Sequence, residues 1–256
     1  MGDIYITGDK HGDFSRLCRT ICQLGTDRES IMIILGDSGI NYYVKNLPEG
    51  EIREGGPRFK NSRTTIRIKK MLSELPITFF CIHGNHEARP ESINSYKTKT
   101  WNGGIVYFEE EYPNILFAKD GEIYDMNGKK HLVAGGAYSI DKYWRLQRYY
   151  AGQKDCLWFE DEQMDDATKD KIMKMIEDQV QIDIVLSHTC PLRFEPIEAF
   201  LKGIDQSTVD KSTEIFLDKV YEKIGNSIKS WYCGHYHIRK VEKNVIFRFD
   251  DIGIEN

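Results

Sequence analysis

The fold is decided by the stretch ITFFCIHGNHE, residues 77–87. Its first six residues are mostly apolar, which predicts a buried strand over residues 77–82. The polar group Gly84-Asn85-His86-Glu87 follows almost at once, where this strand ends. In a parallel α/β sheet the carboxyl ends of the strands meet at one edge, and ligand sites form there. We therefore expect a polar site at the carboxyl edge of a largely parallel sheet.

Strands and helices alternate through the first third of the chain. Residues 4–6 read as a buried strand that ends at Gly8, and residues 30–35 read as a second strand. Between them, apolar residues recur at helical spacing from Phe14 to Leu24, and Gly25 stands where a helix C-cap is expected. A second helix is predicted near residues 63–75. This alternation favours right-handed crossovers and parallel strands.

The middle of the chain reads differently, as short strands separated by turn signals between residues 104 and 138. The turn signals are Pro113-Asn114, Asp120-Gly121 and Asn127-Gly128. Asp-Gly and Asn-Gly between alternating runs are strong hairpin signals, so we expect an antiparallel meander here.

The remainder of the chain predicts two helices, at 160–180 and 208–224, and three strands, at 182–187, 229–233 and 245–249. We find no internal repeat and no polar linker long enough to divide the chain. The expected fold is therefore a single α/β domain over residues 1–256. It consists of two packed mixed β-sheets flanked by helices, a four-layer α/β/β/α sandwich.

Composition narrows the functional classes. The chain has 256 residues, a net charge of −5 and 29% charged residues, so no global basic field attracts nucleic acid or an anionic membrane. A nuclease with a local basic rim remains open. The N-terminus lacks the apolar run of a signal peptide, and no segment approaches the roughly 20 apolar residues that span a bilayer. We expect a soluble, cytoplasmic protein without a membrane partner.

The cysteines fit that expectation. There are six, at positions 18, 22, 81, 156, 190 and 233, and none forms a Cys-x-x-Cys pair. Cys81 and Cys233 lie inside apolar runs, where cysteine behaves as a small buried hydrophobic residue. We expect reduced, structural cysteines, as in a reducing compartment.

The candidate functional residues follow the predicted strands. They are Asp9, His11, Asp37, Asn85, His86, His188, His235 and His237. A mixture of carboxylate, amide and imidazole ligands suits manganese, iron or zinc better than calcium. There are also too many ligands for one ion, whereas two divalent ions about 3.5–4 Å apart and bridged by a carboxylate would use them all.

Each short motif alone has a simpler interpretation. A single Asp-x-His occurs often by chance, a Gly-Asp pair is usually turn chemistry, and a lone histidine after a strand is usually structural. It is their order and their common placement after strands that favour a metal site. His83 and His131 fall outside the set, and for both we expect a structural role.

The ordered motifs resemble those of the calcineurin-like metallophosphoesterase superfamily, in blocks that span residues 8–237. The resemblance implies that one metal is held by Asp9, His11 and His237. It implies that the second metal is held by Asn85, His188 and His235. Asp37 would bridge the two ions, and His86 would stand at the substrate phosphate as a general acid.

A narrower resemblance involves Trp101-Asn102-Gly103-Gly104 and the segment from Gly135 to Lys142, which look like a small group of bacterial and phage metallophosphoesterases. The chain departs from the protein Ser/Thr phosphatases, which carry Asp-Arg-Gly after the bridging aspartate. Here Ser38-Gly39-Ile40 follows instead, so a phosphate clamp must come from elsewhere. Arg145 is a candidate for that clamp, and a solvated surface charge is an equally good interpretation of it.

Two further arginines, Arg89 and Arg148, also lie near the predicted site. We expect both to be solvated surface charges. The aromatic residues around Arg145 could stack on a nucleobase, but packing in the core or a lid is the favoured interpretation.

These observations predict a hydrolase that cleaves a phosphate mono- or diester with a hydroxide bound to two metal ions, manganese being favoured over iron or zinc. Its expected partner is a phosphorylated small molecule or nucleotide. Three alternatives stay open: a nuclease, a protein Ser/Thr-type phosphatase, and a non-catalytic metal-binding scaffold. The oligomeric state is not indicated by the sequence.

Overall fold

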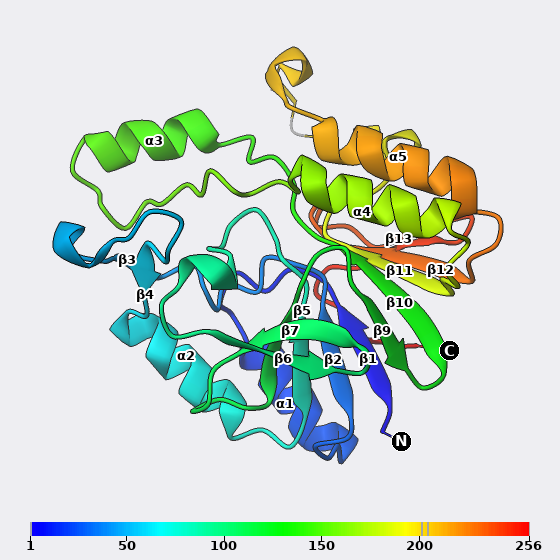
Figure 1. The fold of residues 1–256 in the computed structure, drawn as a ribbon, viewed down its shortest axis with the longest axis horizontal. Helices are drawn as coiled ribbons and strands as arrows, with labels where there is room; N and C mark the ends of the chain where they lie inside the picture. The colour runs from blue at the N-terminus through cyan, green and yellow to red at the C-terminus, as the bar shows by residue number, and fades with distance from the viewer. Residues whose placement is uncertain (1, 201, 204, 256) are drawn as a thin grey trace.

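The computed structural model describes residues 2–200, 202–203 and 205–255 and consists of two mixed sheets packed face to face (Figure 1). Helices cover the outer face of each sheet. The predicted fold class, two mixed sheets flanked by helices, is therefore confirmed.

The larger sheet has seven strands. In spatial order they are β15 (Gly253–Ile254), β1 (Ile4–Thr7), β2 (Ile31–Ile34), β5 (Thr78–Cys81), β8 (Ile115–Ala118), β7 (Gly104–Phe108) and β6 (Lys97–Trp101). The four central strands, β1, β2, β5 and β8, are parallel, as the alternation of strands and helices predicts. The outer strands β15, β7 and β6 run antiparallel to their neighbours.

The smaller sheet has six strands. In spatial order they are β13 (Lys240–Glu242), β14 (Val245–Phe247), β12 (Ser230–Cys233), β11 (Ile184–Ser187), β10 (Lys129–Ala134) and β9 (Ile123–Met126). Strands β10, β11, β12 and β14 are parallel, and both edge strands are antiparallel. A separate two-stranded ribbon joins β3 (Lys45–Asn46) to β4 (Phe59–Lys60).

Helices α1 (Ser15–Leu24) and α2 (Arg63–Ser73) pack on the larger sheet, and α4 (Asp166–Glu177) and α5 (Ser212–Ile224) pack on the smaller one (Figure 1). Their ends follow local sequence signals. Helix α1 ends at Gly25, whose φ of 65° is the left-handed C-cap conformation. Helix α2 begins after Ser62, whose side chain accepts a hydrogen bond from the backbone of Thr65.

The strands explain why the sequence shows continuous apolar runs here. In β1, Ile4 and Ile6 face the layer between the two sheets, while Tyr5 faces α1 and α2. In β11, Ile184 and Leu186 face the same inter-sheet layer, while Val185 faces α4 and α5. Because side chains alternate along a strand, a strand that is covered on both faces must be apolar at every position.

The predicted antiparallel meander is only partly correct. Strands β7 and β8 form a hairpin through Pro113-Asn114, and strands β9 and β10 form one through Asn127-Gly128. Asn127 has a φ of 51° and Gly128 a φ of 74°, as a tight hairpin turn requires. Asp120-Gly121 does not close a hairpin, because β8 and β9 belong to different sheets. The Asp120 carboxylate instead binds Arg89 Nη1 at 2.7 Å and the backbone nitrogen of Gly135 at 2.7 Å. These contacts with distant residues hold the chain where it crosses between the sheets.

Several boundaries also differ from the predictions. Helix α4 begins at Asp166 and not near residue 160, because the Asp165 side chain caps it by accepting a hydrogen bond from the Thr168 nitrogen. Helix α5 begins at Ser212. Helix α3 (Lys142–Tyr150) was not predicted, and none of its residues is buried. Short 3₁₀ turns lie at Glu49–Glu51, Pro90–Ser92, Leu192–Phe194, Ile197–Ala199 and Gln206–Thr208.

All six cysteines are free thiols in this structure. Among the residues described, no helix combines the length and apolar character that crossing a membrane requires.

The layer between the sheets should dominate stability. Leu116 on β8 is 1% exposed and packs in this layer. We predict that Leu116→Ala lowers the free energy of unfolding by about 2–5 kcal/mol, because a buried cavity replaces the side chain. Urea denaturation measures the loss. The control Leu24→Ala, at a side chain that is 39% exposed, should change stability by no more than about 0.5 kcal/mol. Equal losses in the two variants would contradict this assignment of the core.

Candidate metal centre

The eight predicted site residues converge where the parallel strands of both sheets end. Strands β1, β2 and β5 of the larger sheet lead into Asp9 and His11, Asp37, and Asn85 and His86. Strands β11 and β12 of the smaller sheet lead into His188, His235 and His237. The two sheets therefore contribute opposite walls of one site.

One group of donors consists of Asp9, His11 and His237. Asp9 Oδ2 lies 3.2 Å from His237 Nε2 and 3.8 Å from His11 Nε2. The two imidazole Nε2 atoms lie 3.0 Å apart. Asp9 is buried while both histidines are exposed, so this group opens toward solvent.

A second group consists of Asp9, Asp37 and His188, all buried, with donor atoms within 4.8 Å of one another. His188 Nε2 lies 3.5 Å from Asp37 Oδ2 and 2.9 Å from Asn85 Oδ1. The His235 ring stands 4.9 Å from the His188 ring, centroid to centroid. The two groups share Asp9, so they form one continuous cluster of donors.

The donor set fits divalent transition metals. Two buried carboxylates that face each other repel when both are charged, and divalent cations remove that repulsion. The facing nitrogens of His11 and His237 can share only one proton, whereas both lone pairs can bind a common ion. Oxygen and imidazole nitrogen together are ligands that manganese, iron and zinc accept.

The backbone is strained at the positions where the eight residues come together. Four of the eight residues have a positive φ: His11 (46°), Asp37 (43°), His235 (66°) and His237 (52°). Residues other than glycine rarely adopt this left-handed conformation, and each instance costs on the order of 1–3 kcal/mol. Such strain persists only where surrounding contacts enforce it.

Those contacts are hydrogen bonds between loops from different strands. Asp9 Oδ1 accepts a bond from the backbone nitrogen of His235 at 2.9 Å. Asp37 Oδ1 accepts one from the backbone nitrogen of His86 at 2.8 Å, and the Asp37 carbonyl accepts one from His11 at 2.8 Å. Each carboxylate thus fixes a neighbouring loop as well as offering a metal ligand.

Two glycines allow the loops to approach this closely. A Cβ atom on Gly36 would overlap the His188 ring, and a Cβ atom on Gly84 would overlap the Asp37 backbone nitrogen and Oδ1. Gly36 also has a φ of 86°, which an L side chain rarely adopts. Both positions therefore require glycine to bring Asp37 and His188 together.

Hydrogen bonds orient the buried ligands. His188 Nδ1 donates to the Leu35 carbonyl at 2.7 Å, which leaves Nε2 facing Asp37 and Asn85. Asn85 Nδ2 donates to Ser139 Oγ at 2.9 Å, which leaves its Oδ1 facing His188. Such outer contacts fix the tautomer and orientation that a metal ligand needs.

The buried groups also shift one another's pKa values. Burial alone would raise the pKa of Asp37, but His188, His86 and His11 together lower it well below its usual value. Burial alone would lower the pKa of His188, but Asp37 and then Asp9 raise it to about 9. Burial, with a contribution from His188, lowers the pKa of His235 to about 3. Asp37 therefore interacts with histidines of both donor groups.

His86 lies beside the donors. Its ring centroid is 5.7 Å from that of His11, and the residue is only partly exposed. Burial lowers the pKa of His86, and the nearby Arg145 lowers it further while Asp37 opposes the shift.

Arg145 lines a cavity of about 240 Å³ together with His11, Tyr42 and His86. Its Nε donates to Asp141 Oδ2 at 2.8 Å, and its Nη1 donates to the Tyr42 hydroxyl at 3.0 Å and the Leu157 carbonyl at 3.2 Å. Asp141 before α3, Leu157 after α3 and Tyr42 in the loop after β2 thus fix this side chain beside His86.

The prediction for Arg89 is wrong. Arg89 is not a solvated charge, because Nη1 pairs with Asp120 at 2.7 Å and Nε donates to the Asp161 carbonyl at 2.6 Å. It braces the loop after β5 and does not enter the site. Arg148 lies on α3 with its guanidinium 4.8 Å from the Trp144 ring centroid.

The two remaining histidines lie outside the donor groups. His131 Nε2 is 2.8 Å from Glu255 Oε2, and its Nδ1 is 2.9 Å from the Lys129 carbonyl, contacts that suit a structural residue. His83 is buried, and neither ring nitrogen has a hydrogen-bond partner among the described residues. Burial holds the pKa of His83 well below its usual value, so its ring is neutral.

Sequence reasoning missed the residues that link the loops. Glu87 accepts hydrogen bonds from the Ser38 hydroxyl at 2.6 Å and the Ser38 nitrogen at 3.2 Å, which ties the loop of Asp37 to the loop of Asn85. Glu87 belongs to the polar group Gly84-Asn85-His86-Glu87, so its position next to His86 could have indicated a role at the site. No pattern in the sequence indicated Glu214, which borders the site from α5.

Comparisons with known proteins identify a family for this chain. A family model described as calcineurin-like phosphoesterase matches residues 2–239. Among solved structures, TT1561 of Thermus thermophilus is similar, at 14% sequence identity and a TM-score of 0.49, over 100% of this chain and 99% of that chain. A candidate 5′-nucleotidase from Staphylococcus aureus, solved in complex with alpha-ketoglutarate, is similar at 14% identity and a TM-score of 0.46. The match covers 98% of this chain and 52% of that one. A search of curated proteins gives no match.

The close approach at Gly84 yields a test of the site's geometry. We predict that Gly84→Ala weakens manganese binding by about 10- to 100-fold, because the added methyl group displaces Asp37 and its supporting contacts. Calorimetric titration of the metal-free protein with Mn²⁺ measures the affinity. Gly50→Ala is the matched control, since a Cβ at that position meets no atom within 4 Å. Unchanged affinity in Gly84→Ala, with the fold intact by circular dichroism, would contradict this geometry.

Proposed function

The chain belongs to the calcineurin-like phosphoesterase family, and from that premise we propose that it hydrolyses a phosphate mono- or diester at a pair of divalent metal ions. The observation that supports the pair is that two groups of donors form one continuous cluster, which offers more donors than one ion needs. The proposed substrate is a phosphorylated small molecule or nucleotide, and the proposed location is the cytoplasm.

We assign the ligands as the family resemblance implies. Asp9, His11 and His237 would hold one ion. Asn85, His188 and His235 would hold the other. Asp37 would bridge the two, which its proximity to histidines of both groups supports. Manganese is the proposed ion. Two such ions, when bound, lower the pKa of water and neutralise charge on phosphoryl oxygens.

The chain's own residues would complete the chemistry. His86 lies beside the donors, with its ring centroid 5.7 Å from that of His11, and there it would donate a proton to the departing oxygen. A bound phosphate anion favours that role, because a nearby negative charge raises the pKa of an imidazole. Arg145 uses Nε and Nη1 for contacts within the described chain, which leaves Nη2 to donate to a phosphoryl oxygen.

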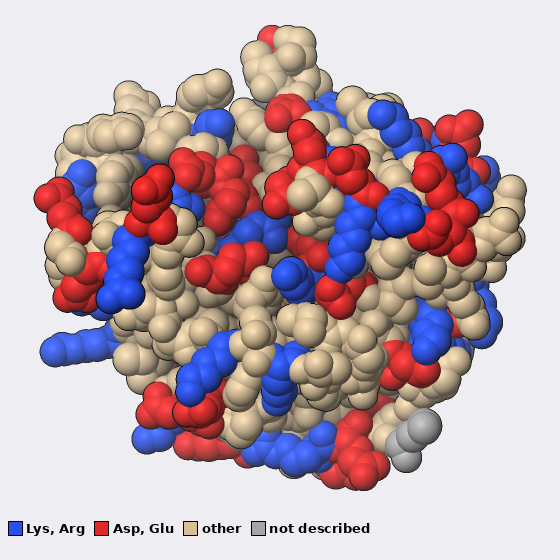
Figure 2. Space-filling view, viewed as in Figure 1, with Lys and Arg blue, Asp and Glu red and all other residues tan. Residues whose placement is uncertain are grey.

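The alternatives have less support. On the face seen in Figure 2, acidic and basic side chains are interspersed, and the described residues of this face form no continuous basic field for a nucleic acid. For a protein phosphatase, the expected Asp-Arg-Gly is replaced here, and Ser38 is bound to Glu87. A non-catalytic metal-binding scaffold does not require a general acid, and the placement of His86 beside the donors is therefore better explained by catalysis.

Metal content and turnover test the proposal together. We predict that the protein binds close to two Mn²⁺ ions per chain and that the metal-free protein regains hydrolysis of p-nitrophenyl phosphate or bis-p-nitrophenyl phosphate when Mn²⁺ is added. Asp37→Asn should bind both ions more weakly and lose turnover, because a carboxylate shared by two cations neutralises more charge than any other ligand. Elemental analysis and p-nitrophenol release are the measurements.

Asp166→Asn serves as the control, because the Asp166 side chain is 95% exposed on α4. It should retain the metal content and rate of the unmodified protein. Saturation at one ion with full activity would overturn the two-metal proposal. Normal metal binding and activity in Asp37→Asn would overturn the assignment of the bridge.

The role of His86 is tested separately from metal binding. We predict that His86→Ala retains its metals but loses about 10²–10⁴-fold in rate on an alkyl phosphate ester. The loss on the p-nitrophenyl analogue of the same ester class should be far smaller, because p-nitrophenolate leaves without a proton. Both rates and the metal content are measured on one preparation. Equal losses on the two substrates would remove His86 from the acid role.

A further inference from the structure

A cavity of about 480 Å³ extends from the metal centre toward α5. At one end it reaches His86 and Asp37. Its other walls are largely apolar and include Tyr138, Phe200 and Tyr236. This volume falls within the range of about 300–1,000 Å³ typical of small-molecule sites, and it is far larger than a phosphate group requires. The cavity therefore has room for the organic part of a substrate.

One buried carboxylate in the cavity has an unsatisfied oxygen. Glu214 on α5 is 5% exposed, and its Oε1 accepts a hydrogen bond from Thr189 Oγ1 at 2.8 Å. Its Oε2 is buried and has no hydrogen-bond partner among the described residues. Thr189 Oγ1 lies 3.1 Å from the Tyr236 hydroxyl, which can donate to it. A buried carboxylate oxygen that lacks a donor is costly, so a ligand that brings a donor would gain affinity here.

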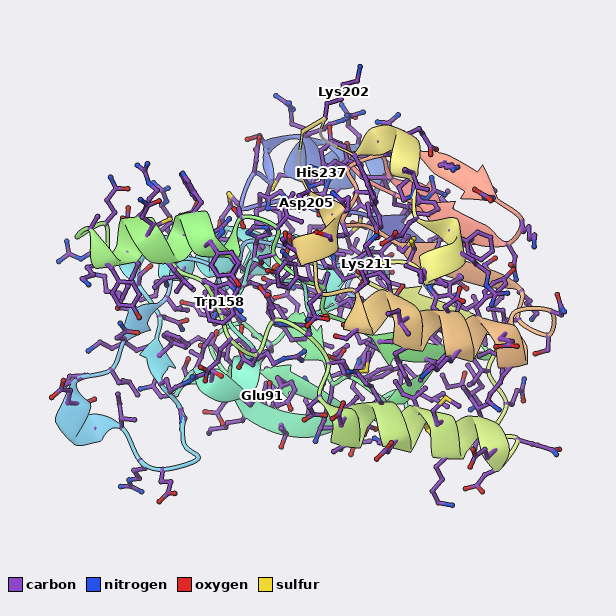
Figure 3. All side chains as sticks on the ribbon, turned by 90° about the horizontal axis from the view of Figure 1, so that it is seen from above. Glu91, Trp158, Lys202, Asp205, Lys211 and His237 are labelled. Atoms are coloured by element: carbon purple, nitrogen blue, oxygen red, sulfur yellow. The ribbon has the colours of Figure 1, made fainter. Side chains whose placement is uncertain are left out.

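The nearest cation is already engaged. Lys211 pairs with Glu195 at 2.6 Å, and its ammonium group lies 5.4 Å from the Phe200 ring centroid. Burial, with a smaller contribution from Glu195, raises the pKa of Glu214 to about 7, while the hydrogen bond from Thr189, a backbone hydrogen bond and the charge of Lys211 oppose the rise. Figure 3 shows Lys211 on the segment that leads into α5, which also carries Asp205, with His237 on the same side of the molecule. Among the described residues, Glu195 thus has its counter-charge, whereas Glu214 forms no ion pair.

Aromatic faces complete the cavity. The rings of Phe200 and Tyr236 are nearly parallel, with an interplanar angle of 15° and centroids 6.1 Å apart, and Tyr138 contributes another ring. Aromatic faces bind flat rings by stacking. A small ammonium head group would also suit a carboxylate among aromatic rings, but it would leave most of this volume empty.

We propose that this cavity binds a flat heteroaromatic ring of nucleobase size in the organic part of the substrate, and that Glu214 accepts a hydrogen bond from an N–H of that ring. The inference rests on the proposed phosphoesterase activity and deepens it, because it specifies what the phosphate is attached to. The substrate class is then a nucleotide or a nucleotide-like ester.

Matched substrates test the proposal. In the manganese-loaded protein, the KM for GMP should be about 10- to 100-fold lower than the KM for ribose 5-phosphate, which carries the same ester without the ring. If the enzyme prefers diesters, the p-nitrophenyl ester of TMP and methyl p-nitrophenyl phosphate replace this pair. In Glu214→Gln the ratio should fall toward one, because an amide replaces the carboxylate acceptor. Glu222→Gln, an exposed position on the same helix, should keep the ratio of the unmodified protein.

A binding measurement separates this proposal from the proposed function. Guanosine, which has no phosphate, should raise the Tm of the metal-free protein, and ribose should not. Glu214→Gln, if it folds by circular dichroism, should lose most of the guanosine shift. If p-nitrophenyl esters are hydrolysed but neither ring preference nor guanosine binding is found, the cavity proposal fails and the proposed function stands. If no ester is hydrolysed but guanosine binds through Glu214, the proposed function fails and the ring site stands. Tighter binding of choline than of guanosine would overturn the choice of ring.

Discussion

The structure depends on two buried carboxylates, Asp9 and Asp37, that are held close together at the junction of the two sheets. Burial and mutual repulsion both oppose this arrangement. Backbone nitrogens from other loops compensate in part, since His235 donates to Asp9 and His86 donates to Asp37. The same bonds fix the loops that carry the remaining ligands. The two buried carboxylates are therefore costly for stability, but they also hold the loops of the site in position.

The four-layer packing supplies what those loops require. Because the strands alternate apolar side chains between the inter-sheet layer and the outer helices, both sheets are rigidly held. Their carboxyl ends can then support four candidate ligands in left-handed conformations, at His11, Asp37, His235 and His237. Strain of this kind is found where a function requires a geometry that the chain would not otherwise adopt.

Residues other than the candidate metal ligands form the walls of the site. Arg89 pairs with Asp120 and thereby joins the loop after β5 to the crossing between the sheets. Arg145 reaches the site from α3, and Glu214 reaches it from α5. The metal centre therefore has two different surroundings, a cationic side near Arg145 and an apolar cavity with one carboxylate near Glu214. This asymmetry would separate the phosphate from the organic part of a substrate.

The sequence by itself determined the parallel strands and the two-sheet fold class, and it predicted the eight candidate site residues that the structure brings together. Each of these rests on a local signal: an apolar run covered on both faces, a turn dipeptide, or a polar group directly after a strand. The tertiary structure alone decided that Asp120-Gly121 crosses between sheets, that Arg89 is an internal brace, and that Glu214 borders the site. Those outcomes depend on contacts between residues far apart in the chain, such as Arg89 with Asp120 and Thr189 with Glu214. No local pattern encodes such contacts, because they exist only once the layers have packed.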